Sequence, residues 1–214
     1  MTPFRLGVLV SGAGTNLQAI LDSLHGQEGV EVACVVASRA AAGGLARAEA
    51  AGVEAAVFAA AGYPDRSSRD EALADFLDAR GVDLLVLAGF MELLSAGFVR
   101  RFEGRIINVH PSLLPAFPGL RPIEQALEYG VRVTGVTVHL VDEGIDTGPI
   151  LLQEAIELPY AADIADVEQR IHAVEHRLLP EAIRMIARGA LREGDAGTGQ
   201  QRRIGIEEGR HGER

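Results

Sequence analysis

Short apolar runs of strand length alternate with longer segments of helical pattern in the first half of the chain. The strand-like runs cover residues 4–10, 31–37 and 82–88. The helical segments cover residues 16–24, 42–51 and 67–80. Such alternation predicts an α/β fold built as a doubly wound, mostly parallel sheet with helices on both faces.

The pattern changes in the second half of the chain. Strand-like runs with shorter connections cover residues 105–109, 133–141 and 150–156, and a long helix is expected from about 164 to 188. The last 22 residues are rich in Gly, Arg, Glu and Gln, so they bury too little apolar surface to offset the cost of ordering. We therefore expect one domain over residues 1–192 and a flexible polar tail over 193–214.

Composition narrows the possible functions. With 214 residues, 48% of them hydrophobic and 23% charged, the chain has the profile of a soluble α/β protein with one sizeable core. The net charge of −10 argues against binding to nucleic acid. No signal peptide or stretch of about 18 apolar residues is evident, so we expect a cytoplasmic protein without a membrane partner. As to its assembly, we expect a monomer or a homodimer.

A glycine-containing turn follows the first strand. Gly12 and Gly14 let the backbone approach a ligand, and the helix after them offers unpaired N–H groups suited to phosphate. A plain strand-to-helix turn is the alternative. Leu17 stands where a dinucleotide site has its third glycine, which disfavours NAD; Arg39 leaves NADP open as a minor alternative. No lysine follows the turn, which excludes a nucleoside-triphosphate loop.

Two polar side chains mark the end of the strand near residue 106. Because side chains alternate across a strand, Asn108 and His110 project to one face, and Pro111 then stops the ladder. An amide and an imidazole can both donate to the oxyanion of an acyl transfer, whereas a hydrogen-bonded structural histidine is the alternative. Among the three acidic residues of the loop at 142–146, Asp146 is best placed to be fixed beside His110 and to accept a proton.

Four motifs in this order closely resemble the phosphoribosylglycinamide formyltransferases. They are Ser-Gly-x-Gly-Thr-Asn-Leu-Gln-Ala-Ile at 11–20, Leu-Ala-Gly-Phe-Met at 87–91, Asn-x-His-Pro-Ser-Leu-Leu-Pro at 108–115 and Asp-x-Gly-Pro at 146–149. The resemblance covers about residues 4 to 190. It implies a Rossmann-like formyltransferase fold and transfer of a formyl group from 10-formyltetrahydrofolate, as co-substrate, to the amine of glycinamide ribonucleotide without a metal.

The resemblance also implies roles for individual residues. The catalytic residues would be Asn108, His110 and Asp146, with the first two stabilising a tetrahedral oxyanion after direct attack by the amine. The residues implied for the ribonucleotide are Gly14, Thr15, Asn16, Arg66 and Glu175, with Arg66 near the phosphate. The residues implied for the folate pocket are Met91, Leu94, Val141, Asp142, Glu143 and Gly144.

This chain departs from the family's pattern at two places. It has Arg121 where histidines are common, and Glu92 where arginine is common. The first change concerns the contacts near the entering substrate, and the second concerns the border of the folate pocket.

Several other interpretations remain open. A formyltetrahydrofolate hydrolase or a methionyl-tRNA formyltransferase would share the motifs but usually carries a further region. His172 and His176 belong to an H-x-x-E-H pattern that a zinc hydrolase could use, although they flank an ordinary apolar helix face. A non-catalytic nucleotide-binding module is another possibility. His139 could be structural or could support the site, and Cys34 lies in an apolar run typical of a buried thiol.

Overall fold

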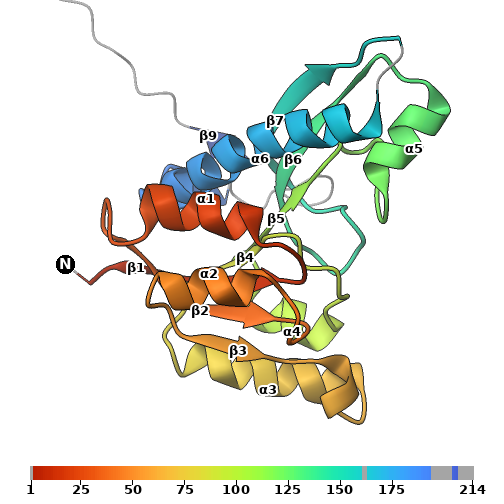
Figure 1. The fold of residues 1–214 in the computed structure, drawn as a ribbon. Helices are drawn as coiled ribbons and strands as arrows, with labels where there is room; N and C mark the ends of the chain where they lie inside the picture. The colour runs from red at the N-terminus through yellow and green to blue at the C-terminus, as the bar shows by residue number, and fades with distance from the viewer. Residues whose placement is uncertain (1, 161–162, 194–203, 207–214) are drawn as a thin grey trace, which may run out of the picture.

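A seven-stranded sheet forms the centre of the molecule, which we describe from a computed structural model (Figure 1). Residues 2–160, 163–193 and 204–206 are described, without the side chains of 191–193 and 204–206. The strands are β1 (Phe4–Val10), β2 (Val30–Ala37), β3 (Ala55–Val57), β4 (Leu84–Leu87), β5 (Ile106–His110), β6 (Val133–Leu140) and β7 (Ile150–Glu157). Their order is β3-β2-β1-β4-β5-β6-β7. Strands β1 to β5 pair in parallel, and β6 pairs antiparallel with both β5 and β7, which confirms a mostly parallel sheet.

Helices cover both faces of this sheet, as the sequence predicted. The helices are α1 (Thr15–Leu24), α2 (Gly44–Ala50), α3 (Arg66–Asp78), α4 (Ala96–Arg101), α5 (Pro122–Tyr129) and α6 (Ile164–Ala187), with a 3-10 turn at Ala60–Gly62. One buried cluster joins Val8 and Val86 to residues of α1 and α6, such as Ile20 and Leu179. Alternation along the strands turns Leu9 to the other face, into a second cluster with α3 and α4.

Some elements differ from the sequence expectation. The short elements β3, α4 and α5 were not predicted, because six to eight residues or fewer give little periodicity to detect. Leu191–Glu193 and Ile204–Ile206 pair as antiparallel strands β8 and β9, whereas the rest of the expected polar tail lies outside the described residues. Within the described part of the chain, no helix is both long and apolar enough to span a membrane.

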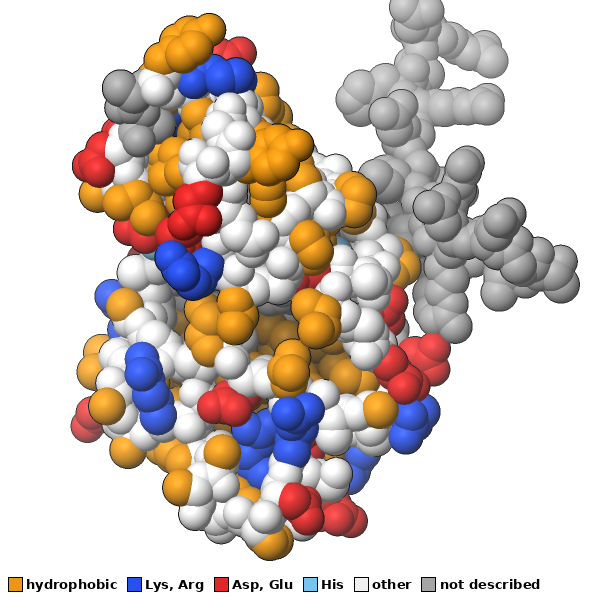
Figure 2. Space-filling view, turned by 90° about the vertical axis from the view of Figure 1, so that its right-hand side faces the viewer, with side chains coloured by type: hydrophobic (Ala, Val, Ile, Leu, Met, Phe, Trp, Pro, Cys, Tyr) orange, Lys and Arg blue, Asp and Glu red, His pale blue; other side chains and the backbone are white. Residues whose placement is uncertain are grey.

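The topology brings several loops together around the middle of the sheet. Because β1, β4 and β5 are parallel neighbours, the turns after them meet at the same edge of the sheet. The antiparallel pairing of β5 with β6 then sets His139 directly opposite Asn108. Figure 2 looks at the side that lies on the right in Figure 1, where hydrophobic side chains line a hollow bordered by acidic and basic ones.

Candidate active site

The carboxylate of Asp146 faces the buried imidazole of His110. Oδ2 of Asp146 lies 3.5 Å from Nδ1 of His110 and accepts a hydrogen bond of 2.7 Å from the backbone N–H of Gly119. The other ring nitrogen of His110, Nε2, lies 2.9 Å from the carbonyl oxygen of Phe117. A carbonyl can only accept, so Nε2 carries a hydrogen, and a second proton on Nδ1 would be directed at Asp146.

The loop that carries Asp146 is fixed by its own hydrogen bonds. Oδ1 of Asp142 accepts from the N–H of Gly144 at 3.0 Å and from Oγ1 of Thr147 at 2.7 Å. Asp146 itself has a φ of 53°, a left-handed conformation that Asp tolerates better than most residues. This closed turn holds the Asp146 carboxylate in a defined position instead of leaving it solvated.

The surroundings of Asp146 lower its pKa below 3.8. The largest single effect is burial, which raises the pKa because it penalises the charged carboxylate. Hydrogen bonds from His139 and the Gly119 N–H lower the pKa, as do the charges of His110 and His139. Together they outweigh the effect of burial. The carboxylate is therefore ionised at neutral pH.

Asn108 has a second imidazole, that of His139, as its neighbour. Nδ2 of Asn108 lies 3.2 Å from Nε2 of His139, and Nδ1 of His139 lies 2.8 Å from the carbonyl oxygen of Leu140. The carbonyl requires a hydrogen on Nδ1, so in the neutral ring Nε2 accepts from Asn108. Nε2 also lies 3.5 Å from Oδ1 of Asp146, to which the protonated ring would donate.

His139 is more closely involved in the site than the sequence predicted. The sequence slightly favoured a structural histidine at this position, whereas the ring is 2% exposed and contacts both Asn108 and Asp146. The signal available in the sequence was the place of His139 on a predicted strand, which the structure pairs with the strand of Asn108. The antiparallel register that sets the two opposite each other is a tertiary property.

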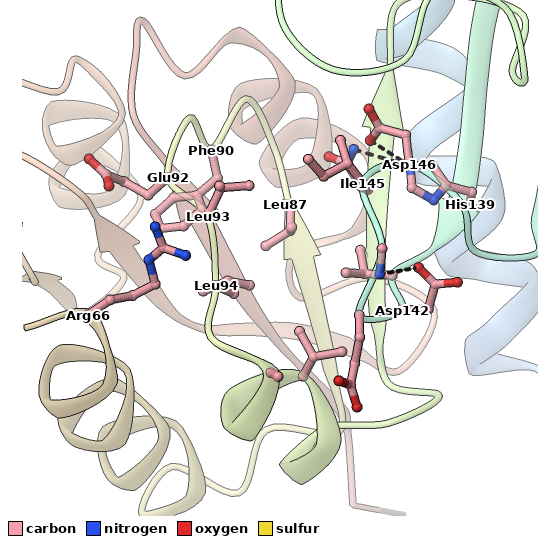
Figure 3. Close-up of a pocket in the computed structure, with 16 residues that line it drawn as sticks. Arg66, Leu87, Phe90, Glu92, Leu93, Leu94, His139, Asp142, Ile145 and Asp146 are labelled. Atoms are coloured by element: carbon pink, nitrogen blue, oxygen red, sulfur yellow. Dashed lines mark hydrogen bonds and ion pairs between the residues drawn. The ribbon is translucent and has the colours of Figure 1, made fainter.

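A pocket of about 250 Å³ opens beside this cluster (Figure 3). Asn108, His139 and Asp146 form part of its lining. Of the residues expected to bind folate, the pocket is lined by Leu94, Val141, Asp142, Glu143 and Gly144. Further lining residues that the sequence reasoning did not assign to folate include Leu87, Phe90, Leu93 and Ile145. The pocket thus combines apolar side chains with polar groups on two opposite sides, as is typical of ligand sites.

Met91 and Arg66 lie differently from the sequence expectation. Met91 is 71% exposed and is absent from the lining, although its backbone N–H donates to Oγ of Ser11 at 2.8 Å. Arg66 lines the same pocket as Leu94, and Figure 3 shows it on the side opposite Asp142 and Asp146. The structure therefore places Arg66 with the expected folate residues and not in the glycine turn.

Gly14 forms the start of α1 at the glycine turn. Its φ is 75°, and a Cβ there would come within 2.6 Å of the Cα of Gly44, so only glycine fits this position. No side chain caps the helix at Gly14, which leaves the first N–H groups of α1, including those of Thr15 and Asn16, without intrahelical partners. Such a helix start attracts anions.

A buried carboxylate lies against this helix start. Glu175 of α6 is 4% exposed, and its Oε2 accepts from Nδ2 of Asn16 at 3.0 Å. The same oxygen lies 2.9 Å from Nδ1 of His172. The structure thus brings together Asn16 and Glu175, which the sequence reasoning assigned to the same ligand.

The H-x-x-E-H pattern does not form a metal-binding cluster. His172 and His176 stack with ring centroids 6.1 Å apart, and Nδ1 of His172 is engaged by Glu175. In the described part of the chain, no group of three or more His, Cys, Asp or Glu side chains is arranged to hold a metal ion.

Comparison with known proteins shows what this chain is similar to. Residues 4–183 match the family model described as formyl transferase. The phosphoribosylglycinamide formyltransferase of Haemophilus influenzae is 41% identical over 189 residues, which are 88% of this chain and 89% of that protein. A solved structure, glycinamide ribonucleotide transformylase 1 from Symbiobacterium toebii, is 50% identical with a TM-score of 0.88, covering 96% of this chain and 94% of that one.

A longer relative matches over only part of its length. The trifunctional purine biosynthetic protein adenosine-3 of Bos taurus is 41% identical over 194 residues, which are 90% of this chain but 19% of that protein. The chain therefore spans only a small share of the trifunctional relative.

Proposed function

Because the chain belongs to the formyl transferase family, we propose that it transfers the formyl group of 10-formyltetrahydrofolate to the amine of glycinamide ribonucleotide, in purine biosynthesis. The names of relatives matched over most of their length support formyl transfer to this ribonucleotide. The observation that carries the proposal is that Asn108 and Asp146 line the same pocket, while the buried imidazole of His110 lies 3.5 Å from the carboxylate of Asp146. These three residue types can support acyl transfer without a covalent enzyme intermediate.

In the proposed reaction the substrate amine attacks the formyl carbon directly. A new C–N bond forms, and the formyl oxygen takes the negative charge of a tetrahedral intermediate. The amide N–H₂ of Asn108 and the imidazolium of His110 stabilise this oxyanion. The bond from the formyl carbon to the folate nitrogen then breaks, and the proton lost by the amine is transferred, with the help of Asp146, to that nitrogen.

The pocket provides a suitable environment for the folate co-substrate. Its apolar lining, including Leu87, Phe90 and Leu94, suits a flat aromatic ring system. Arg66 lines this pocket and has no ion-pair partner among the described residues. We therefore assign it to binding a carboxylate of the folate tail, and not the phosphate of the ribonucleotide. The ribonucleotide would occupy the glycine turn, with its phosphate at Gly14, Thr15 and Asn16 and its ribose hydroxyls near Glu175.

A spectroscopic assay of tetrahydrofolate release tests this function. Wild-type protein is incubated with 10-formyltetrahydrofolate in the presence and absence of glycinamide ribonucleotide. We expect release only with the ribonucleotide, and a loss of about 100-fold or more when His110 is replaced by Ala. Release without the ribonucleotide would instead identify a hydrolase, and the absence of release under both conditions would contradict formyl transfer.

A further inference from the structure

Ser11 joins the turn after β1 to the segment after β4. These two strands are parallel neighbours, and the strand order reverses between them, because β2 lies beyond β1 on one side and β5 beyond β4 on the other. Turns that leave such a point diverge and open a crevice for ligands. The turn after β1 leads to the uncapped start of α1, the expected place of the ribonucleotide. The segment after β4 carries Phe90 and Leu94, which line the expected folate pocket (Figure 3).

The backbone pairing of β1 with β4 ends at Gly89. The N–H of Ala88 donates to the carbonyl of Leu9 at 2.9 Å, and the N–H of Ser11 donates to the carbonyl of Gly89 at 3.1 Å. Gly89 has a φ of 73°, a left-handed conformation that turns the chain away from the strand direction. The carbonyl of Ser11 accepts from Nε of Arg39 at 2.7 Å. Pairing beyond the bend therefore requires a different acceptor.

The hydroxyl of Ser11 provides this acceptor. The backbone N–H of Met91 donates to Oγ of Ser11 at 2.8 Å, two residues past the bend at Gly89. Oγ of Ser38, which directly follows β2, donates to the same oxygen at 2.7 Å. Ser11 and Ser38 are 4% and 7% exposed, and a hydrogen bond shielded from water is stronger than an exposed one. One buried side chain thus extends the contact between the two turns.

This contact lies between the expected positions of the two substrates. In the proposed reaction the amine belongs to the ligand at the start of α1, whereas the formyl carbon belongs to the ligand of the pocket. Their separation depends on how the turn after β1 lies against the segment after β4. A misplacement of about 1 Å can lower a reaction rate by about 100-fold. A residue that fixes this separation should therefore affect the rate of transfer more than the affinity for either substrate.

We propose that Ser11 is a positioning residue for formyl transfer, whose hydroxyl holds residues 89–91 against the glycine turn and so aligns the two substrates. The inference rests on the proposed function for the identity of these substrates. A pair of buried hydroxyls that only stabilises the fold is the alternative. It predicts a loss of stability without a change in the rate of transfer.

The test compares the full chain with Ser11→Ala and Ser38→Ala. Ser11→Ala removes the acceptor of the Met91 N–H. Ser38→Ala removes the other hydroxyl of the same buried pair but leaves that acceptor in place, so it is the matched control. The rate is that of a single turnover with both substrates saturating, which separates the transfer step from product release. Urea unfolding measures the stability of each variant.

We expect Ser11→Ala to lower the single-turnover rate by about 10- to 100-fold and to change KM for each substrate by about threefold or less. Ser38→Ala should keep a rate within about threefold of the wild type, although both variants lose stability. A rate of Ser11→Ala within threefold of the wild type would overturn the proposal. An equal loss of rate in Ser38→Ala, or a loss confined to KM, would also overturn it.

Amide hydrogen exchange followed by NMR tests the hydrogen bond itself, even if Ser11→Ala does not fold. In the wild type the Met91 amide should exchange about tenfold or more slowly than in an unfolded chain, and an unprotected Met91 amide would overturn the proposal. Folded Ser11→Ala should lose this protection, whereas Ala88, which donates to Leu9, should keep its own.

The activity of the wild type separates this inference from the proposed function. A wild type that transferred no formyl group would contradict the proposed function, and the positioning role with it. Transfer by the wild type with an equally fast Ser11→Ala would contradict only the inference.

Discussion

Oδ2 of Asp146 lies 3.5 Å from Nδ1 of His110, at the junction of a loop between β6 and β7 with the end of β5. The other carboxylate oxygen, Oδ1, lies 3.5 Å from Nε2 of His139. One carboxylate thus faces two imidazoles, of which the second also contacts Asn108. Removing the negative charge of Asp146 should therefore affect every residue of the cluster.

Asp146→Asn should lower kcat/KM for formyl transfer by about 100-fold or more. Asn has nearly the same shape and tolerates the left-handed φ of 53°, so the loop should keep its conformation. The variant removes the negative charge that faces the imidazole of His110 at 3.5 Å. The measurement is the tetrahydrofolate release assay, with Asp75→Asn, an exposed carboxylate paired with Arg101, as control. Activity within threefold of the wild type would exclude a catalytic role for Asp146.

The lowered pKa of Asp146 also predicts a pH dependence of stability. The folded pKa lies below the unfolded value near 3.8, so the carboxylate contributes stability above 3.8. This contribution is lost as the pH falls through the folded pKa. Urea unfolding of the wild type and Asp146→Asn should therefore give free energies of unfolding that differ by a constant amount well above pH 3.8 and converge as the pH falls below it. A difference between them that stays constant with pH would contradict this linkage.

Gly14→Ala should destabilise the protein and weaken binding of the ribonucleotide. Its φ is 75°, and the added Cβ would meet the Cα of Gly44 at 2.6 Å, so the turn must shift. Strain of this kind costs roughly 1–3 kcal/mol. A Cβ at Gly12 would meet no atom within 4 Å, so Gly12→Ala should change the free energy of unfolding by roughly 0.5 kcal/mol or less. Equal stability losses from chemical denaturation of both variants would show that the close approach at Gly14 is unimportant.

Arg69→Met should loosen the wall of the pocket. Arg69 and Asp70 are 3% and 1% exposed and form an ion pair, and Arg69 also donates to Glu92 and to the carbonyl of Leu93. Removing the cation leaves buried Asp70 without its charge partner, which costs about 3–5 kcal/mol. We expect that loss in urea unfolding, together with a higher KM for 10-formyltetrahydrofolate.

The double variant Arg69→Met with Asp70→Leu provides the control for Arg69. It removes both buried charges, so it should recover much of the lost stability. If the double variant were as unstable as Arg69→Met alone, the unpaired carboxylate would not be the cause.

Cys34 should be unreactive in the native protein. Its side chain is 0% exposed, and burial raises the pKa of the thiol to about 11, so little thiolate exists at pH 8. Mass spectrometry after treatment with iodoacetamide should find an unmodified protein in buffer and one modification in urea. Rapid modification of the folded protein would contradict the buried position.

The strands and the main helices could be predicted because each carries its own periodicity. Residues Phe4–Val10 form the first strand as expected, and Ile164–Ala187 forms the long helix within a residue or so of its expected ends. The helices α4 and α5 escaped prediction because they are short and begin at local features, such as the hydrogen bond from the Phe98 N–H to Ser95 Oγ. Local signals of this kind are also common in turns.

The sequence by itself determined the alternating α/β pattern, the glycine that α1 requires at its start, and the strand that turns Asn108 and His110 to one face. These features depend on neighbours along the chain and on alternation within a single element. Only the tertiary structure decided that His139 lies opposite Asn108, that Asp146 reaches both imidazoles, and that Arg66 lies in the apolar pocket. Strand register and the path of a loop are set by packing between segments distant in sequence, which no local pattern encodes.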